Sequence, residues 1–404
     1  MRSIFYRISA NTFVQILGKI ISTAFSLVTV SLLTRYLGKE GFGSYTLVFT
    51  YLSFFSISAD LGLQLTMVRE IAKKKEASSI YYGSFFWLKL SLVLFSTLLA
   101  LAVLVFFPYP RILKAGIILA SLGVSLGNLN NFGVIIFQAN LRMDLVTLVD
   151  VAAKILTAGL IIFLVFIQSG FYSIINAVLI GNLVASFLIF IFLKRFIKYD
   201  FKFSYKVAKA LLIKSLPVGL LTFLAFFNFK IDTLLLSIYR SIEEVGVYSL
   251  AYKIIENLFL PWSYYMATVY PLLANLYKDN LIQAEKLFKK SIITAIISSS
   301  LIILIGFIFA PLIIRILGGE EFKESLTLLR ILLFSLPFFF INNLYYHMFL
   351  VKETFKKLYQ ITCLSLIINL ALNLLLISKW GSLAAASNVL ITEIFILFLY
   401  IFFN

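Results

Sequence analysis

Long apolar runs separated by short polar segments make up most of this chain. The runs lack the strict alternation of apolar and polar residues that marks a half-buried strand. A helix needs about 20 consecutive apolar residues to cross the roughly 30 Å hydrocarbon core of a bilayer, and lipid-exposed backbone must satisfy its own hydrogen bonds. The pattern therefore predicts an all-α membrane protein with about twelve transmembrane helices. We place them near 12–34, 42–66, 82–107, 112–138, 145–167, 171–193, 210–238, 245–273, 290–311, 325–350, 358–377 and 382–403.

One short sequence occurs twice in the chain. The stretch "LTRYLGKEGFGSYTL" at 33–47 resembles "LSIYRSIEEVGVYSL" at 236–250, which lies 203 residues later in a chain of 404. This offset predicts two similar lobes of six helices each. An even number of helices returns the chain to its starting side, so the lobes form a parallel repeat about an axis along the membrane normal. We interpret the doubled sequence as the same outer turn of each lobe, where Gly43 and Gly246 allow a tight reversal.

The most basic segment of the chain, "KRFIKYDFKFSYKVAK" at 194–209, falls between the sixth and seventh apolar runs. We interpret it as a cytoplasmic linker between an N-terminal lobe, residues 1–200, and a C-terminal lobe, residues 201–404. The first apolar run follows Arg2 and Arg7 and is not followed by a small-residue cleavage site. It is therefore predicted to be a retained first helix rather than a signal peptide.

Composition and charge agree with a multi-pass protein of the cell membrane. Hydrophobic residues make up 61% of the chain and charged residues only 13%, against about 25% charged in an ordinary globular domain. The net charge of +17 comes mostly from the predicted inner segments, which hold twenty Lys and Arg against eight in the outer ones. The positive-inside rule thus explains the excess and places both termini in the cytoplasm. Anionic lipid headgroups are the expected contacts of these residues, and a nucleic acid partner is not needed.

The sequence offers little for catalysis. Cys363 and His347 are the only residues of their types, which excludes an intrachain disulfide, a thiolate metal cluster and the usual zinc or catalytic-triad sets. The predicted loops are short and carry no paired acidic residues of the kind that hold a metal in membrane glycosyltransferases. We therefore predict no enzyme activity, no cofactor and no metal, and expect that the protein moves a substrate across the bilayer.

Polar residues inside the predicted helices fall on one face, at steps of three and four. Interhelical hydrogen bonding by small polar side chains is the ordinary explanation of one such stripe. Several stripes in both lobes favour a shared aqueous cavity. The clearest stripes are Gln15, Lys19, Ser22, Ser26 and Thr29 in the first helix and Thr362, Ser365, Asn369 and Asn373 in the eleventh.

Charged residues within the helices are more informative, because a Lys, Arg or Asp at a helix centre costs about 2.5–3.5 kcal/mol on insertion scales. The deep ones are Lys19, Lys154, Lys230, Lys253, Asp232, Glu256 and Glu393. Four others are placed closer to helix ends, where they can snorkel to the interface: Lys89, Lys214, Asp60 and Asp150. Helical spacing allows ion pairs between Asp150 and Lys154 and between Lys253 and Glu256. Lys19 has no carboxylate at such spacing, which favours a role in binding an anion.

The order and spacing of several segments resemble one known family. These segments are "LTRYLGKEGFGSYTL", "ADLGLQLTMVREIAKK" at 59–74, "FFNFKIDTLLLSIYRSIEEVGVYSLAYKIIE" at 226–256 and "YPLLANLY" at 270–277. Over essentially the whole chain they are similar to the polysaccharide (Wzx-type, O-antigen or oligosaccharide-lipid) flippase branch of the multidrug, oligosaccharidyl-lipid and polysaccharide (MOP) exporter superfamily.

The resemblance implies a V-shaped pair of six-helix bundles that opens alternately to each side of the membrane. It implies a substrate, a polyprenyl-diphosphate-linked oligosaccharide that is moved to the outer leaflet, and coupling to a gradient of H⁺ or Na⁺. Glycan polymerases or ligases are the implied protein partners. The implied cationic lining consists of Lys19, Lys154, Lys230 and Lys253. The implied counter-charges or coupling-ion ligands are Asp60, Asp232, Glu256 and Glu393.

Two alternatives remain open at this level. A drug or metabolite exporter of the same superfamily would use the same lobes with a smaller and more acidic cavity. The prominence of lysine among the deep charges favours an anionic headgroup instead. A non-transporting scaffold of a glycan-assembly complex would be insensitive to substitutions in the cavity.

Overall fold

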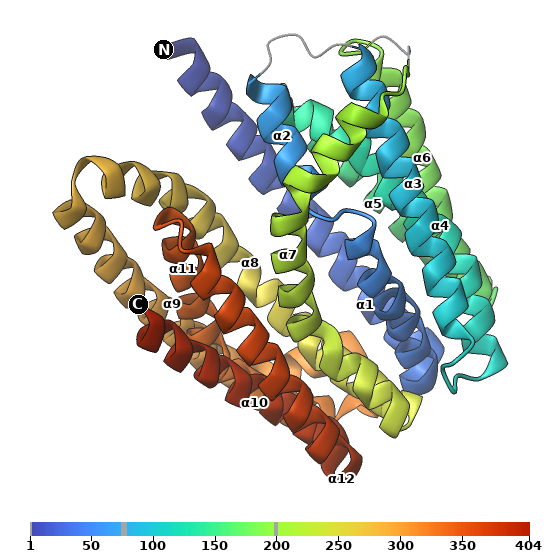
Figure 1. Ribbon diagram of the computed structural model, residues 1–404. Coiled ribbons are helices and arrows are strands. Elements are labelled where there is room, and N and C mark those ends of the chain that lie inside the picture. Colours follow the sequence, from blue (N-terminus) through green and yellow to red (C-terminus); the bar gives the residue numbers. More distant parts are fainter. Residues whose placement is uncertain (1, 74–78, 198–200) are drawn as a thin grey trace. The chain divides into compact units, whose positions relative to one another are not determined.

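The computed structural model describes residues 2–73, 79–197 and 201–404, and all regular structure in them is helical (Figure 1). The chain divides into two compact units. The N-terminal unit contains residues 1–36 and 48–223, and the C-terminal unit contains residues 37–47 and 224–404. The lobes predicted from the sequence, 1–200 and 201–404, stay a prediction, and the proposed linker includes residues 198–200, which lie outside the described ranges together with residues 74–78.

Long helices dominate both units. The chain begins with α1 (Arg2–Ser58), α2 (Leu63–Lys73), α3 (Ser79–Leu104), α4 (Arg111–Ala139), α5 (Met143–Phe166), α6 (Phe171–Leu193) and α7 (Tyr205–Tyr239). It continues with α8 (Ile242–Asp279), α9 (Leu281–Gly318), the 3₁₀ turn η1 (Glu320–Phe322), α10 (Ser325–Leu333), α11 (Leu336–Val351) and α12 (Phe355–Phe403). The predicted all-α class is confirmed.

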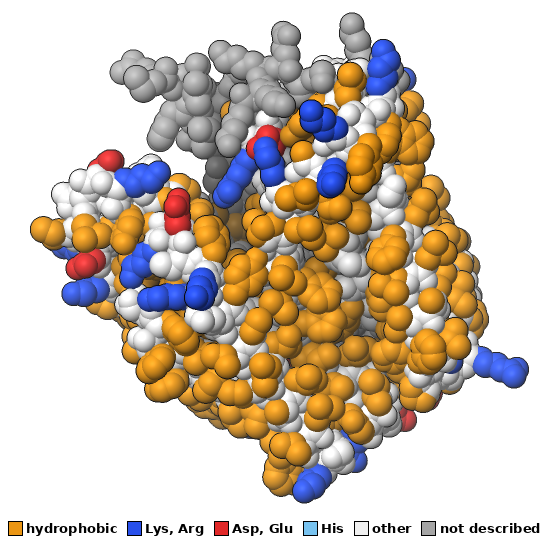
Figure 2. Space-filling view, viewed as in Figure 1, with side chains coloured by type: hydrophobic (Ala, Val, Ile, Leu, Met, Phe, Trp, Pro, Cys, Tyr) orange, Lys and Arg blue, Asp and Glu red, His pale blue; other side chains and the backbone are white. Residues whose placement is uncertain are grey.

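Within the described ranges, eight helices are long and apolar enough to cross a membrane, or nine if the bent pair α10 and α11 is one span. Two of the eight, α1 and α12, each cover two predicted spans, because Gly38 and Gly381 interrupt them with non-helical backbone. The predicted eighth span corresponds to α8, which is not one of these eight helices and which carries Lys253 and Glu256 within the predicted span. Figure 2 shows apolar side chains over most of the visible surface, as expected for helices in contact with lipid.

The second predicted span, 42–66, is not one continuous helix. The helix α1 ends at Ser58 and α2 begins at Leu63, and Leu61 and Gly62 between them have positive φ angles of 42° and 75°. A buried lysine satisfies the backbone at this break. The Nζ of Lys89 donates to the carbonyl oxygen of Ala59 at 3.1 Å and lies 3.0 Å from Oδ1 of Asp60. Since the side chain of Lys89 is completely buried, the interpretation that it snorkels to the membrane surface is wrong.

The charges at this break match the two helix ends. A cation beside the last carbonyls of α1 and an anion before the first turn of α2 complement the partial charges of the helix termini. Lys89 is the cation at the end of α1. Asp60 is the anion before α2, and its Oδ2 accepts from the backbone N–H of Gln64 in the first turn of α2 at 3.4 Å. The pair therefore holds a broken helix in an apolar environment, where unsatisfied backbone groups would be costly.

The same break lies against the backbone of α7 within the N-terminal unit. A Cβ atom added at Gly62 would lie 2.5 Å from the nitrogen of Gly219 and 2.7 Å from the carbonyl oxygen of Ser215. Pro217, between these two residues, interrupts the hydrogen bonding of α7. The close approach of two irregular helices at this point needs glycine on both sides.

Substituting Gly62 with alanine is expected to destabilise the protein by about 3 kcal/mol, because the change combines a positive φ with a backbone clash. The melting temperature of the detergent-solubilised protein is the measurement. Gly159→Ala, in α5 with nothing within 4 Å of the added Cβ, is the matched control and should be neutral or slightly stabilising. Equal melting temperatures for the two variants would contradict this account of the helix crossing.

Residues 37–47 of the first copy of the doubled sequence pack against the second copy in the C-terminal unit. A Cβ at Gly43 would lie 2.1 Å from the carbonyl oxygen of Ile242, and one at Gly246 would lie 2.2 Å from that of Lys39. Both glycines are helical, and the positive φ of this segment belongs to Gly38. The prediction that Gly43 and Gly246 make the tight reversals is therefore wrong. Their role is to let two helices approach backbone to backbone.

Candidate functional site

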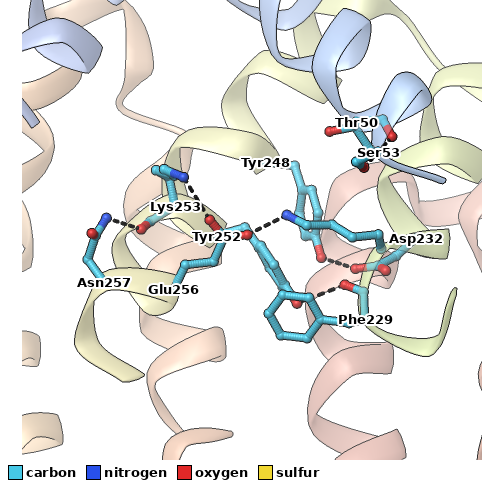
Figure 3. Close-up of polar contacts among 10 residues, drawn as sticks. Thr50, Ser53, Phe229, Asp232, Tyr248, Tyr252, Lys253, Glu256 and Asn257 are labelled. Atoms are coloured by element: carbon cyan, nitrogen blue, oxygen red, sulfur yellow. Dashed lines mark hydrogen bonds and ion pairs between the residues drawn. The ribbon is translucent and has the colours of Figure 1, made fainter. Parts of the chain in front are cut away.

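A cluster of charged and aromatic side chains lies between α7 and α8 in the C-terminal unit (Figure 3). The α8 members Tyr248, Tyr252 and Glu256 follow one another at intervals of four residues, so they share one face of the helix. This face meets Lys230 and Asp232 of α7. Four of the predicted site residues, Lys230, Asp232, Lys253 and Glu256, are thus brought together by two neighbouring helices.

Two lysines share one carboxylate in this cluster. The Nζ of Lys230 bonds to Oε1 of Glu256, and the Nζ of Lys253 lies 3.0 Å from Oε2 of the same side chain. The predicted pair of Lys253 and Glu256 is confirmed, whereas the bond from Lys230 crosses between helices. At Glu256 two ammonium groups share one carboxylate, which leaves a local surplus of one positive charge, although Asp232 balances the charges of the four residues as a set. Such a charge is costly unless an anion shares it.

Aromatic rings hold Lys230 in place. Its Nζ lies 4.9 Å from the ring centroid of Tyr252 and 5.4 Å from that of Phe229, within the range of cation–π attraction. The side chain of Lys230 is 19% exposed, against 43% for Lys253. Lys230 is therefore the more fixed and more enclosed of the two cations.

Asp232 occupies a different environment from Glu256, although both belong to the cluster. Its side chain is 1% exposed, and its Oδ2 accepts a hydrogen bond from the hydroxyl of the fully buried Tyr248. Its Oδ1 has no hydrogen-bond partner among the described residues. The hydroxyl of Tyr252 donates instead to the carbonyl oxygen of Phe229 at 2.9 Å.

The polar stripe predicted for the eleventh span is buried in α12, where it makes hydrogen bonds to α7 and across the break of α12 at Gly381. Asn369 donates to Oδ1 of Asn228 on α7 at 2.9 Å, and Asn388, beyond the break, donates to Oδ1 of Asn373 at 3.0 Å. These are the bonds expected from the ordinary explanation of such a stripe. Further along α12, Oε2 of Glu393 accepts from Nδ2 of Asn342 at 2.7 Å.

A cavity of about 260 Å³ adjoins the charged cluster inside the C-terminal unit. It is lined by α7, α8, α11 and α12, and Glu256 belongs both to this lining and to the lysine pair. Its walls carry aromatic rings, side-chain amides and carboxylates, including those of Phe339, Asn342 and Glu393. Polar groups of this kind, set in an apolar wall, fix the orientation of a bound ligand.

The remaining predicted site residues belong to the N-terminal unit. Lys154 on α5 lies 3.9 Å from Oδ1 of Asp150, which confirms the predicted pair, and Oδ2 of Asp150 accepts from Ser22 of α1 at 3.1 Å. Lys19 is half-exposed on α1, one turn before Ser22, and makes no hydrogen bond or ion pair with the described residues. Asp60 is already paired with Lys89 at the helix break.

Several residues of the site were missed by the sequence analysis. Tyr248, Tyr252 and Asn342 carry no charge, and an aromatic or amide residue in an apolar run is common in any membrane helix. The spacing of four residues from Tyr248 through Tyr252 to Glu256 is the signal that could have found the two tyrosines. Among the described residues, no group of three or more His, Cys, Asp or Glu could hold a metal ion.

Comparisons with known proteins agree with this architecture. The family described as "Polysaccharide biosynthesis protein" matches residues 8–277, well over half of the chain. The chain belongs to the polysaccharide biosynthesis protein family. The MatE family also matches, over residues 217–375. A relative of this polysaccharide biosynthesis protein is the "Putative O-antigen transporter" of Shigella flexneri, which is 24% identical over 400 residues, 93% of this chain and 92% of the relative.

Solved structures of the MOP superfamily share the fold of this polysaccharide biosynthesis protein. An inward-facing multidrug resistance MATE transporter matches with a TM-score of 0.80, 18% identity and coverage of 97% of each chain. The lipid II flippase MurJ, in an inward closed conformation, matches with a TM-score of 0.75, 15% identity and coverage of 96% of this chain and 86% of its own. A MOP superfamily transporter from Pyrococcus furiosus gives 0.70 at 17% identity, with 98% and 95% covered.

The family match and the fold match are two separate findings about this chain. It belongs to the polysaccharide biosynthesis protein family, its described residues contain eight or nine candidate membrane spans, and its fold is that of the MOP superfamily transporters. The predicted resemblance to the polysaccharide branch of that superfamily is confirmed.

Proposed function

We propose that this transporter is a flippase that moves a polyprenyl-diphosphate-linked oligosaccharide from the cytoplasmic to the outer leaflet for the synthesis of a surface glycan. The observation that carries the proposal is the surplus positive charge of Lys230 and Lys253 on Glu256, within membrane helices and next to a polar cavity. A diphosphate is an anion that can share two ammonium groups, since charge-assisted hydrogen bonds are about twice as strong as neutral ones. The name of the Shigella flexneri relative, an O-antigen transporter, supports a glycan substrate.

In this mechanism the lysines hold the diphosphate, the cavity takes sugars, and the prenyl tail stays in the bilayer. Two lobes of six helices would open alternately to the two sides, with both termini in the cytoplasm. Lys19 and Lys154 are the candidates for further cationic lining in the N-terminal unit. A glycan polymerase or ligase would receive the substrate at the outer surface.

Coupling to H⁺ or Na⁺ belongs to the same proposal. Of the four acidic candidates, Asp60 and Glu256 are occupied by lysines at 3.0 Å or closer and are best explained as counter-charges. Asp232 has an unpartnered oxygen in a buried position. It is therefore the stronger candidate for binding the coupling ion.

A drug or metabolite exporter is the second candidate function, because the MatE family matches residues 217–375 and a MATE transporter has the same fold. The lysine pair favours an anionic substrate over the organic cations that an acidic cavity would select. A scaffold without transport activity would not need a charged cluster in its helices.

Deleting the gene in its host is expected to cause a prenyl-linked oligosaccharide to accumulate while the mature surface glycan disappears. Mass spectrometry of lipid extracts measures the first effect and surface glycan staining the second. Expression of the wild-type chain should reverse the accumulation and restore the glycan. Expression of Lys19→Ala tests whether Lys19 is part of the cationic lining in the N-terminal unit. Normal glycan levels without accumulation, in a host that lacks a second flippase, would favour the small-molecule exporter.

A further inference from the structure

The cavity beside the lysine pair is rich in hydrogen-bond acceptors that lack a donor. Asn342 is only 6% exposed and lines the cavity, and its Oδ1 has no partner among the described residues. Oδ1 of Asn343, also in the lining, is equally without a partner in the described part of the chain. A buried polar atom without a partner costs about 1–3 kcal/mol, so a ligand that donates hydrogen bonds here recovers that cost.

Glu393 adds a carboxyl group to the same wall. One oxygen, Oε2, accepts from Nδ2 of Asn342 at 2.7 Å, and no lysine or arginine of the described residues lies within ion-pair distance of this carboxylate. Glu256, in contrast, is neutralised by two lysines. The free acceptor capacity of the cavity is therefore concentrated around Glu393, Asn342 and Asn343.

Besides these polar groups, the cavity has an aromatic lining. The rings of Phe229 and Phe259 both meet Phe339 edge-on, with centroids 6.2 Å and 6.3 Å apart. All three belong to the lining, and so do Tyr346 and Tyr400. A ligand that fits must present an apolar face to the rings and hydroxyl or amide donors to the carboxylate and amides. A sugar ring has both, because its C–H groups form faces and its hydroxyls point outward from the edge.

The size and position of the cavity restrict the class of ligand that it can bind. A volume of about 260 Å³ is large enough for one sugar ring. A bare cation would need several oxygens at about 2.0–2.6 Å and would leave this space empty. Because Glu256 lines the cavity and also contacts Lys230 and Lys253, the cavity adjoins the proposed diphosphate site, as the first sugar of a lipid-linked glycan adjoins its diphosphate.

We infer that this cavity is the binding site for the sugar attached directly to the diphosphate, with Glu393, Asn342 and Asn343 accepting its hydrogen bonds and Phe339 packing against its ring. The inference rests on the proposed flippase function and adds to it the part of the substrate that the C-terminal unit selects. It assigns Glu393 to sugar recognition rather than to ion coupling.

Binding of three probes to the purified full-length protein in lipid nanodiscs tests the inference. The probes are farnesyl diphosphate alone and farnesyl diphosphate carrying one glucose or one N-acetylglucosamine. We expect at least one glycosylated probe to bind about tenfold tighter than farnesyl diphosphate, the equivalent of one hydrogen bond to a charged group. Glu393→Gln should remove most of this gain and leave the affinity for farnesyl diphosphate unchanged. Phe339→Leu, which keeps an apolar side chain without a ring face, should also reduce it.

The control is Glu285→Gln, which removes one negative charge from an exposed position on α9 and should bind all probes as wild type does. If no sugar increases the affinity over farnesyl diphosphate, or if Glu393→Gln weakens all three probes equally or none of them, the sugar site is refuted. Such results leave the flippase proposal standing, provided that farnesyl diphosphate binds and that Lys230→Ala weakens it. Failure of farnesyl diphosphate itself to bind would refute the flippase proposal.

Discussion

Replacing Lys230 with alanine is expected to lower glycan export by about thirtyfold while the protein folds normally. Lys230 is the more enclosed of the two lysines on Glu256 and is fixed between two aromatic rings. Its removal leaves one lysine, Lys253, on Glu256, and a lost hydrogen bond between a diphosphate and an ammonium group costs about 2 kcal/mol. Glu256 keeps Lys253 as a partner at 3.0 Å, so the carboxylate of Glu256 is not left unpaired.

Export is measured as surface glycan in a deletion strain that carries each variant at equal protein level. Lys214→Ala is the matched control, because Lys214 lies on the same helix but its side chain is 58% exposed and its only ion-pair partner in the described chain is Glu70 at 3.4 Å. This control should export normally. Lys230→Arg keeps the charge and should retain part of the activity. Full export by Lys230→Ala would refute the cationic site.

Replacing Lys89 with methionine is expected to destabilise the protein by about 3 kcal/mol, the low end of the usual cost of breaking a buried ion pair, because the Asp60 that is left alone is 28% exposed. Lys89 is completely buried and contacts both Asp60 and the carbonyl of Ala59 at the break between α1 and α2. Methionine fills a similar volume without a charge. The uncompensated carboxylate and the freed carbonyl then disfavour the broken helix.

Thermal unfolding followed by size-exclusion chromatography in detergent measures this effect. The double variant Lys89→Met with Asp60→Asn removes both charges and should recover most of the lost stability, since neutral replacement of a buried pair is often tolerated. Lys214→Met, which removes a lysine that is 58% exposed from its pair with Glu70, should cost clearly less than Lys89→Met. If Lys89→Met alone is as stable as the wild type, the ion pair of Lys89 and Asp60 does not stabilise the break between α1 and α2.

Local patterns in the sequence predicted the features that depend on a single helix. The spans follow from apolar length, and the pairs of Asp150 with Lys154 and of Lys253 with Glu256 follow from steps of four and three residues along one helix. The inward face of the eleventh span follows from the period of its polar stripe. These features need no knowledge of which helices are neighbours.

Contacts between residues on different helices could not be predicted from patterns along one helix. Lys89 was expected at the membrane surface because its depth was judged from its own helix, and its partner Asp60 lies at a helix break that no proline marks in the sequence. The bond from Lys230 to Glu256 joins residues 26 positions apart on two helices. The cavity needs four helices to form its walls.

The sequence by itself determined that the chain spans a membrane, that it repeats after 203 residues, and that its deep charges include an unusual number of lysines. Only the tertiary structure decided which charges meet, where the second helix breaks, and that residues 37–47 of the first copy of the doubled sequence pack against the second copy in one unit. The reason is physical. Helix formation and lipid exposure are set by neighbours along the chain, whereas the partner of a buried charge is set by which helices pack together.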